Sequence, residues 1–125
     1  MRLHRILLPV RDIDAGSAFY GAAFGEPGER VAVNRHYFDG GGVVVGLRDP
    51  MQDAAIVPLS EIVYFSTDEP LEAVRDRWVA SGGSLDADVQ TYDWGETSFY
   101  GRDPWGNQLC FIAAGTEFSG GRFVP

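Results

Sequence analysis

The amino-acid sequence predicts an α+β fold made of two consecutive βαβββ modules. A pattern of strand, helix and further strands begins at residue 3 and begins again at residue 61. In both copies the helical stretch starts close to an aspartate and ends at a glycine, and these residues commonly cap helices. The chain has 125 residues, which suits one compact protein and not two independent domains. We therefore expect a duplicated fold whose halves pair their sheets.

Residues 1–50 are expected to form the first module. Residues 3–10 are apolar and rich in branched side chains, as in a buried strand. The helix is expected to run from Asp12, a favourable N-cap residue, to Gly25, a favourable C-cap residue. Residues at helical spacing predict one apolar face, made of Ala15, Ala18, Phe19, Ala22 and Ala23.

Two further strands are expected after this helix. The alternation of residues over 31–36 predicts one strand. Asp39 and the glycines that follow it predict a hairpin turn, after which residues 43–47 form the next strand. A polar linker that contains proline is expected at 51–60.

Residues 61–114 are expected to form the second module, followed by a glycine-rich tail at 115–125. Asp68 is the expected N-cap of its helix, and Pro70 fits the first helical turn. The apolar face of this helix is expected to contain Leu71, Val74 and Trp78. The strands are expected at 61–67, 84–92, 96–102 and 107–114, with turns at 93–95 and 103–107.

The composition of the chain excludes several binding partners and several kinds of catalytic group. The formal net charge of −8 disfavours phosphate backbones and anionic membranes, so neither nucleic acid nor a membrane is expected as a partner. The sequence contains no lysine, which excludes a Schiff-base lysine and the lysine of a P-loop. Cys110 is the only cysteine, so an internal disulfide is excluded. Because no long apolar run and no signal-peptide pattern is present, the expected location is the cytoplasm.

Two stretches carry a family resemblance. PVRDIDAGSAFYGAAFG at residues 9–25 and SFYGRDPWGNQLCFI at residues 98–112 resemble the vicinal oxygen chelate superfamily. That superfamily includes glyoxalase I, bleomycin-resistance proteins, fosfomycin-resistance enzymes and extradiol dioxygenases. The resemblance covers residues 3–114. It implies two βαβββ modules that form an open, cleft-lining mixed β-barrel with the helices outside, and it implies a homodimer.

The resemblance also implies four metal ligands in the metal-dependent members, and the first two are missing here. The first ligand position, counted back five residues from Val10, holds Arg5, and a guanidinium does not ligate a divalent metal. His4 is adjacent, but strand alternation points it to the opposite face. The second position falls within residues 43–47, where no side chain can bind a metal.

The third and fourth ligand positions are only partly suited to a metal. The third is Glu61 or, in another alignment, Ile62. The fourth, counted seven residues from Asp103, is Cys110, which favours soft metals. With His36 these residues would make an unconventional set. We therefore predict that the usual metal site is absent and that no cofactor is bound.

Seven residues are predicted to line the cleft. They are Arg5, His36, Tyr37, Glu61, Trp94, Phe99 and Cys110. Arg5 would hold a carboxylate or an enolate-like oxygen, or would pair with Glu61 across the cleft. The aromatic residues would bind a flat, apolar or cationic ligand, although Phe99 also suits the core. His36 would act as an acid or base, or only make a hydrogen bond at a strand end. The apolar neighbours of Cys110 favour an inert core thiol over a nucleophile.

These observations predict a protein that binds a small organic ligand without catalysis and sequesters an aromatic or cationic compound. The alternative is an enzyme of the lyase, isomerase or dioxygenase type. It would use an unconventional metal, or acid–base chemistry through Arg5, Glu61 and His36. A third hypothesis is a dimeric interaction module whose cleft is filled by side chains. The fold alone does not decide among them.

Overall fold

The computed structural model describes residues 1–51 and 55–121. Two compact units are present, residues 1–60 with 104–107 and residues 61–103 with 108–125. Residues 52–54 of the expected linker and residues 122–125 of the expected tail lie outside the described residues. Each unit is a four-stranded mixed sheet with one helix, so the α+β class and the repeated βαβββ module are confirmed.

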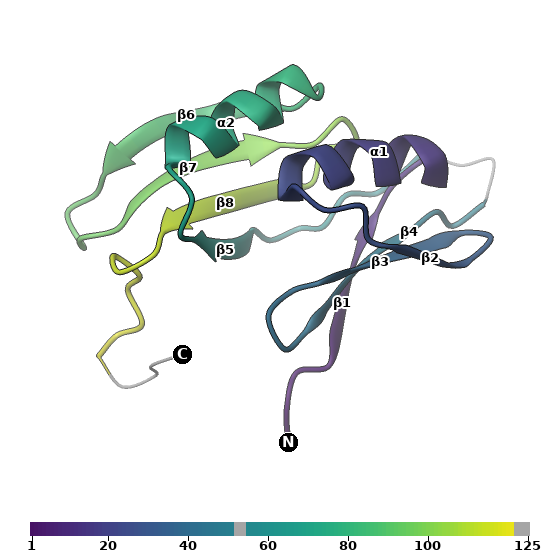
Figure 1. Ribbon diagram of the computed structural model, residues 1–125, viewed down its shortest axis with the longest axis horizontal. Helices are drawn as coiled ribbons and strands as arrows, with labels where there is room; N and C mark the ends of the chain where they lie inside the picture. The colour runs from purple at the N-terminus through teal and green to yellow at the C-terminus, as the bar shows by residue number, and fades with distance from the viewer. Residues whose placement is uncertain (52–54, 122–125) are drawn as a thin grey trace. The chain divides into compact units, whose positions relative to one another are not determined.

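The first unit carries its helix on one face of its sheet (Figure 1). Its elements are β1 (Arg5–Pro9), α1 (Ile13–Phe24), β2 (Glu29–Ala32), β3 (Arg35–Asp39) and β4 (Val44–Arg48). The strand order is β1-β4-β3-β2. Strands β1 and β4 are parallel, and the other pairs are antiparallel. The parallel pair requires a crossover, which α1 and the β2–β3 hairpin supply.

The ends of α1 agree with the sequence prediction. The Asp12 carboxylate accepts hydrogen bonds from the backbone N–H groups of Asp14 at 3.0 Å and Ala15 at 3.3 Å. At the other end Gly25 has a φ of 75°, the left-handed conformation in which a helix commonly stops.

The predicted apolar face of α1 is correct for Phe19 and Ala23 and wrong for its three other residues. The buried residues are Ile13, Gly16, Phe19, Tyr20 and Ala23, whereas Ala15, Ala18 and Ala22 are exposed. Burying Ile13 and Tyr20 removes far more apolar surface from water than burying three alanines does. Gly16 allows this rotation of the helix, since a Cβ there would lie 2.9 Å from Cγ2 of Val10.

The single strand expected at 31–36 is also wrong. Strand β2 ends at Ala32 and β3 begins at Arg35, with a tight turn at Val33 and Asn34 between them. Asn34 supports the turn, because its Nδ2 donates a hydrogen bond to the Asp49 carbonyl at 3.0 Å. The alternation continues through the turn residues, so it hides the reversal of the chain.

The second unit repeats this arrangement. Its elements are β5 (Val63–Thr67), α2 (Leu71–Ala80), β6 (Ser84–Thr91), β7 (Thr97–Arg102) and β8 (Gln108–Ala113), with strand order β5-β8-β7-β6. Pro70, not Asp68, is the N-cap of α2, and no side chain caps the helix. The predicted face is confirmed, because the buried residues of α2 are Leu71, Val74 and Trp78.

Trp78 holds α2 against its sheet through two glycines. Cβ atoms built at Gly83 and Gly101 would lie 2.3 and 2.4 Å from Nε1 of Trp78, so only glycine admits the indole there. The indole Nε1 donates a hydrogen bond to the Ser84 carbonyl at 3.0 Å, and its ring contacts Phe111 edge to face. A fully buried tryptophan thus keeps its polar atom satisfied.

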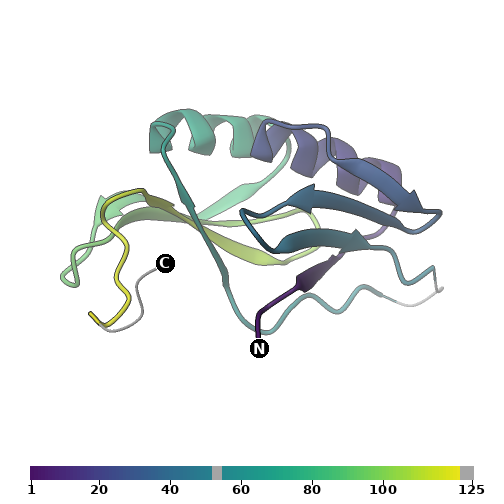
Figure 2. The ribbon, with the colours of Figure 1, turned by 60° about the horizontal axis from the view of Figure 1, so that its bottom comes forward.

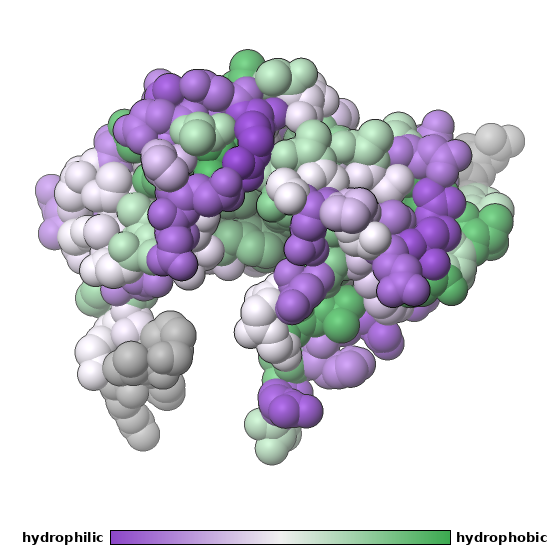
Figure 3. All heavy atoms as spheres, in the orientation of Figure 1, coloured by the Kyte–Doolittle hydropathy of each residue, from purple (hydrophilic) through white to green (hydrophobic). Residues whose placement is uncertain are grey.

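The outer surface of α2 is largely hydrophilic (Figure 3). Neither helix among the described residues is long and apolar enough to cross a membrane.

Gly101→Ala is expected to lower the free energy of unfolding by about 2 kcal/mol, because the added methyl group would clash with the indole ring of Trp78. Urea unfolding would measure this loss. In a Trp78→Phe background, Gly101→Ala should lower the free energy of unfolding by less, since the indole nitrogen that the new methyl group would meet is gone. An equal cost in both backgrounds would show that the indole is not the reason for this glycine.

Candidate functional site

Each sheet has one face covered by its helix and one face free of helix, which we call the open face. In the first unit, Leu8, Phe38, Val45 and Leu47 are buried on the covered face. Because side chains alternate along a strand, the residues between them belong to the open face. These are Arg5 and Leu7 of β1, Val44, Gly46 and Arg48 of β4, and Arg35, Tyr37 and Asp39 of β3.

Arg5 and Tyr37 meet on the open face of the first sheet. Cζ of the Arg5 guanidinium lies 5.4 Å from the centroid of the Tyr37 ring, within the range of a cation–π interaction. On the neighbouring strand, Gly46 leaves room for this ring, since a Cβ there would be 3.0 Å from Cε1 of Tyr37. Two of the predicted cleft residues are therefore in contact.

A pocket of about 450 Å³ lies at the hairpin end of this open face. Tyr37 forms part of its wall, and the carboxylates of Glu29 and Asp39 and the imidazole of His4 add polar groups. Val31, Val43 and Val44 give it apolar surface. This end of the face suits a small ligand that has both apolar and polar parts.

His36 lies on the covered face of the same sheet, away from Arg5 and Tyr37. Its side chain is 8% exposed and contacts the Phe38 ring. Nε2 lies 2.7 Å from the carbonyl oxygen of Pro27, and because a carbonyl only accepts, this nitrogen carries the proton. The geometry thus gives His36 the hydrogen-bonding role that the sequence left open beside acid–base chemistry.

In the second unit, Phe111 stacks with both Phe65 and Phe99 on the covered face and contacts Trp78 edge to face. Phe99 is completely buried there, so it is a core residue and does not reach the open face. Cys110 belongs to the open face and pairs across the sheet with Tyr64 and Tyr100.

Aromatic side chains gather on this second open face and in the turn beside it. Tyr92 and Trp94 are stacked, with ring centroids 4.6 Å apart and planes 15° apart. Tyr100 contacts the ring of Tyr92 edge to face at 6.0 Å and that of Tyr64 at 6.2 Å. Trp94 is 48% exposed, so one side of the stack is open to a ligand.

Glu96 fixes the position of this stack. Its Oε1 accepts a hydrogen bond from Nε1 of Trp94 at 2.9 Å. Its Oε2 accepts one from the backbone N–H of Phe118 at 2.8 Å. The tail that contains Phe118 runs on the side of the sheet away from α2 (Figure 2). One carboxylate therefore joins the aromatic turn to the tail.

The Cys110 thiol lies among these groups and is completely buried. Burial raises its pKa, the nearby hydroxyl groups of Ser98 and Tyr100 oppose the rise, and the charge of Glu96 adds to it. Burial also raises the pKa of Tyr92 and of Tyr100, well above the usual range for the latter. At neutral pH Cys110 is protonated, which agrees with the inert thiol that its neighbours favour.

Glu61 lies two residues before β5 begins and is exposed. The ion pair expected between Arg5 and Glu61 stays a prediction, as does an unconventional metal set that includes Glu61.

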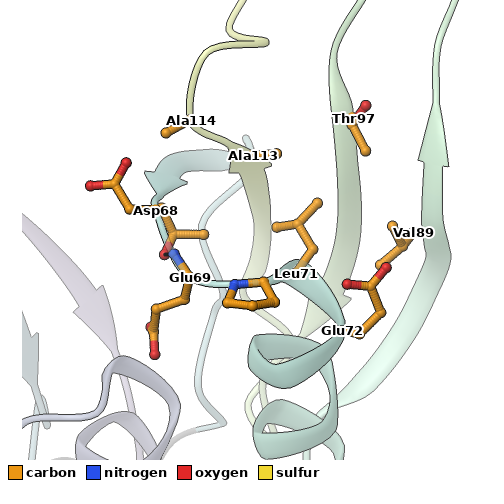
Figure 4. Close-up of a pocket in the computed structure, with 10 residues that line it drawn as sticks. Asp68, Glu69, Leu71, Glu72, Val89, Thr97, Ala113 and Ala114 are labelled. Atoms are coloured by element: carbon orange, nitrogen blue, oxygen red, sulfur yellow. Dashed lines mark hydrogen bonds between the residues drawn. The ribbon is translucent and has the colours of Figure 1, made fainter.

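A second pocket, of about 310 Å³, lies at the N-terminal end of α2 (Figure 4). Leu71, Val89 and Ala113 give it apolar surface, and Glu69 and Glu72 lie among its lining residues. Because Ala113 has the strand parity of Phe111, this pocket is on the covered side of the sheet. It is thus separate from the aromatic cluster.

The side chains of the open faces do not fit the metal site that the family resemblance implies. Arg5 has no lone pair to donate, and β4 presents Val44 and Gly46 beside it. Cys110 pairs across the second sheet with Tyr64 and Tyr100, which offer no strong metal ligand beside the thiol. Within residues 1–51 and 55–121 no three or more His, Cys, Asp or Glu side chains are grouped so that they could hold a metal ion.

Sequence comparison defines the class of protein. The profile of the Glyoxalase/Bleomycin resistance protein/Dioxygenase superfamily matches residues 2–111, so the chain belongs to this superfamily. No curated protein matches the sequence.

Solved structures of the superfamily share the fold. A glyoxalase-related enzyme from Fulvimarina pelagi has a TM-score of 0.77 and 21% sequence identity, over 90% of this chain and 88% of that one. A glyoxalase/bleomycin resistance protein from Albidiferax ferrireducens T118 has a TM-score of 0.74 and 21% identity, over 89% and 98% of the two chains. A glyoxalase/bleomycin resistance protein/dioxygenase family enzyme from Burkholderia phytofirmans PsJN has a TM-score of 0.75 and 18% identity, over 90% and 98%.

Tyr64, Arg35 and Arg48 of the open faces are not among the seven cleft residues predicted from the sequence. Tyr64 lies opposite Cys110 and completes the aromatic cluster, and Arg35 and Arg48 flank Tyr37 on the first sheet. Strand alternation carries a signal for all three. The signal is usable only when strand boundaries are known, because a shift of one residue exchanges the faces.

Cys110 is expected to resist alkylation by iodoacetamide at pH 8 in the native protein and to react fully in denaturant. Burial blocks access and raises the pKa of the thiol, so little thiolate forms. Mass spectrometry of the intact chain would count the modified molecules. Rapid modification of the native protein would contradict a buried, neutral thiol.

Stability is expected to fall as pH rises above about 9, because raised pKa values keep Cys110, Tyr92 and Tyr100 protonated in the folded chain only. Below about pH 9 these groups are protonated in both the folded and the unfolded chain, so they do not change the stability. Each such group can add at most about 1.4 kcal/mol per pH unit to this loss of stability. Thermal unfolding across pH 7–11 would measure it, and Tyr100→Phe should make the slope shallower. An unchanged slope in that variant would contradict the assignment.

Proposed function

We propose that this superfamily member binds a small organic compound with a planar ring and sequesters it without a metal. The observation that carries this proposal is the exposed Tyr92–Trp94 stack, which Tyr100 and Tyr64 extend along the open face of the second sheet. Rigid aromatic side chains bind flat ligands by burial and ring geometry at a low entropic cost. The hydrogen bond from Trp94 to Glu96 holds the indole in place before a ligand arrives.

Glu96 favours a ligand that also carries a positive charge. Its side chain is 7% exposed, and none of the described arginines or histidines forms an ion pair with it. A shielded carboxylate beside aromatic faces attracts an organic cation more than a neutral molecule of the same shape. The net charge of −8 acts in the same direction over longer distances.

The acid–base alternative receives less support from the geometry. Arg5 and His36 lie on opposite faces of one sheet, and His36 uses Nε2 for the Pro27 carbonyl. A substrate that contacts Arg5 on the open face is not within reach of this imidazole.

Trp94→Ala is expected to weaken binding of 1-methylquinolinium and of its neutral isostere 1-methylnaphthalene by about tenfold each, since both lose the indole face. In the wild-type protein the cation should bind more tightly than the isostere. Isothermal titration calorimetry would give the dissociation constants.

Val79→Ala is the matched control, because Val79 is 49% exposed and lies on α2. Val79→Ala removes a similarly exposed apolar side chain on the other side of the sheet. Its dissociation constants for both probes should equal those of the wild type. The proposal fails if neither probe binds, or if Trp94→Ala and Val79→Ala have the same effect.

A further inference from the structure

Three arginines occupy the open face of the first sheet around Tyr37. The Arg5 guanidinium lies over the Tyr37 ring, and Nη1 of Arg35 lies 3.5 Å from the Tyr37 hydroxyl oxygen. Arg48 is the direct cross-strand partner of Arg35. The sequence prediction placed only Arg5 in the cleft, so the group as a whole emerges from the register of β3 and β4.

The Arg35–Arg48 pair is unfavourable for the isolated chain. Directly opposite residues of antiparallel strands have Cβ atoms roughly 5 Å apart, and like charges at that separation destabilise a sheet. A bound anion between the two guanidinium groups would reverse the sign of the interaction.

Within residues 1–51 and 55–121, no carboxylate neutralises these arginines. The chain has 18 acidic and 10 basic residues, yet no described carboxylate forms an ion pair with Arg5, Arg35 or Arg48. Asp49, the neighbour of Arg48, instead accepts hydrogen bonds from backbone N–H groups of residues 12 and 51.

The other acidic groups of this face belong to its hairpin end. The Asp39 carboxylate accepts a hydrogen bond from the Gly41 N–H at 2.8 Å, and Glu29 lies on β2 beside Tyr37. Arg30, the remaining arginine of this sheet, is paired with Asp14 at 2.6 Å. On this sheet, the arginines around the Tyr37 hydroxyl are thus the ones that have no counter-ion among the described carboxylates.

We propose that Arg35 and Arg48, together with Arg5 and Tyr37, bind the carboxylate or phosphate group of a small molecule on the open face of the first sheet. Guanidinium groups match both oxyanions through paired N–H donors, and the Tyr37 hydroxyl adds another donor. This site lies in the first unit and does not depend on ligand binding at Trp94.

The experiment compares the wild-type protein with Arg48→Gln and Arg35→Gln, with Arg2→Gln as the control. Arg2→Gln removes the same charge from an exposed residue before β1. The midpoint of thermal unfolding is measured at low ionic strength in a Tris–chloride buffer, then with inorganic phosphate or benzoate added. Sodium chloride at equal ionic strength separates binding from screening.

Without an oxyanion, Arg48→Gln and Arg35→Gln should each raise the unfolding midpoint by roughly 2 °C, since the like-charge contact is removed. Phosphate or benzoate should raise the midpoint of the wild type and of Arg2→Gln, with apparent affinity at least about tenfold lower in Arg48→Gln. The probe with the larger effect identifies the favoured oxyanion. Trp94→Ala should leave this response unchanged.

Three results would overturn the proposal. If sodium chloride raises the unfolding midpoint as much as the oxyanions do, charge screening alone explains the effect. An equal oxyanion response in Arg48→Gln and the wild type means that these arginines do not form the site. A lower midpoint for both glutamine variants without an oxyanion means that the arginines stabilise the fold itself.

Discussion

The structure depends on the covering of one face of each four-stranded sheet by a helix. Strand side chains alternate between faces, so once Trp78 packs over Gly83 and Gly101 the faces of the whole second sheet are assigned. Gly16 has the corresponding role where α1 approaches Val10 in the first unit. Every candidate ligand-binding residue that lies on a strand is on an open or a covered face as a consequence of this packing.

The two open faces have different chemistry. On the first sheet, arginine side chains surround Tyr37, and the position at which the family resemblance implies a metal ligand holds Arg5. On the second sheet, aromatic rings lie beside a buried thiol, and the Glu96 carboxylate accepts a hydrogen bond from Trp94. Fixed cations and aromatic surfaces bind organic groups without a metal, which is the physical basis for the function that we propose.

Several features could be predicted from local sequence because they depend on local physics. Asp12 caps α1 through its side chain, and Gly25 ends the helix through its left-handed backbone conformation. Both caps are as predicted. The turn at Val33 and Asn34 was missed, because Asn34 is its single turn-favouring residue and the alternation runs through it. Three alanines were wrongly placed on the buried face of α1, because a count of apolar residues ignores how much surface each side chain buries.

The sequence by itself determined the α+β class, the duplication and the superfamily, because these follow from periodicity, capping residues and motifs within single segments. Only the tertiary structure decided which side chains meet. His36 and Phe99 lie on covered faces, whereas Arg35 stands opposite Arg48 and Tyr64 opposite Cys110. The physical reason is that strand register and helix rotation are set by packing between segments, and a shift of one residue exchanges the two faces of a strand.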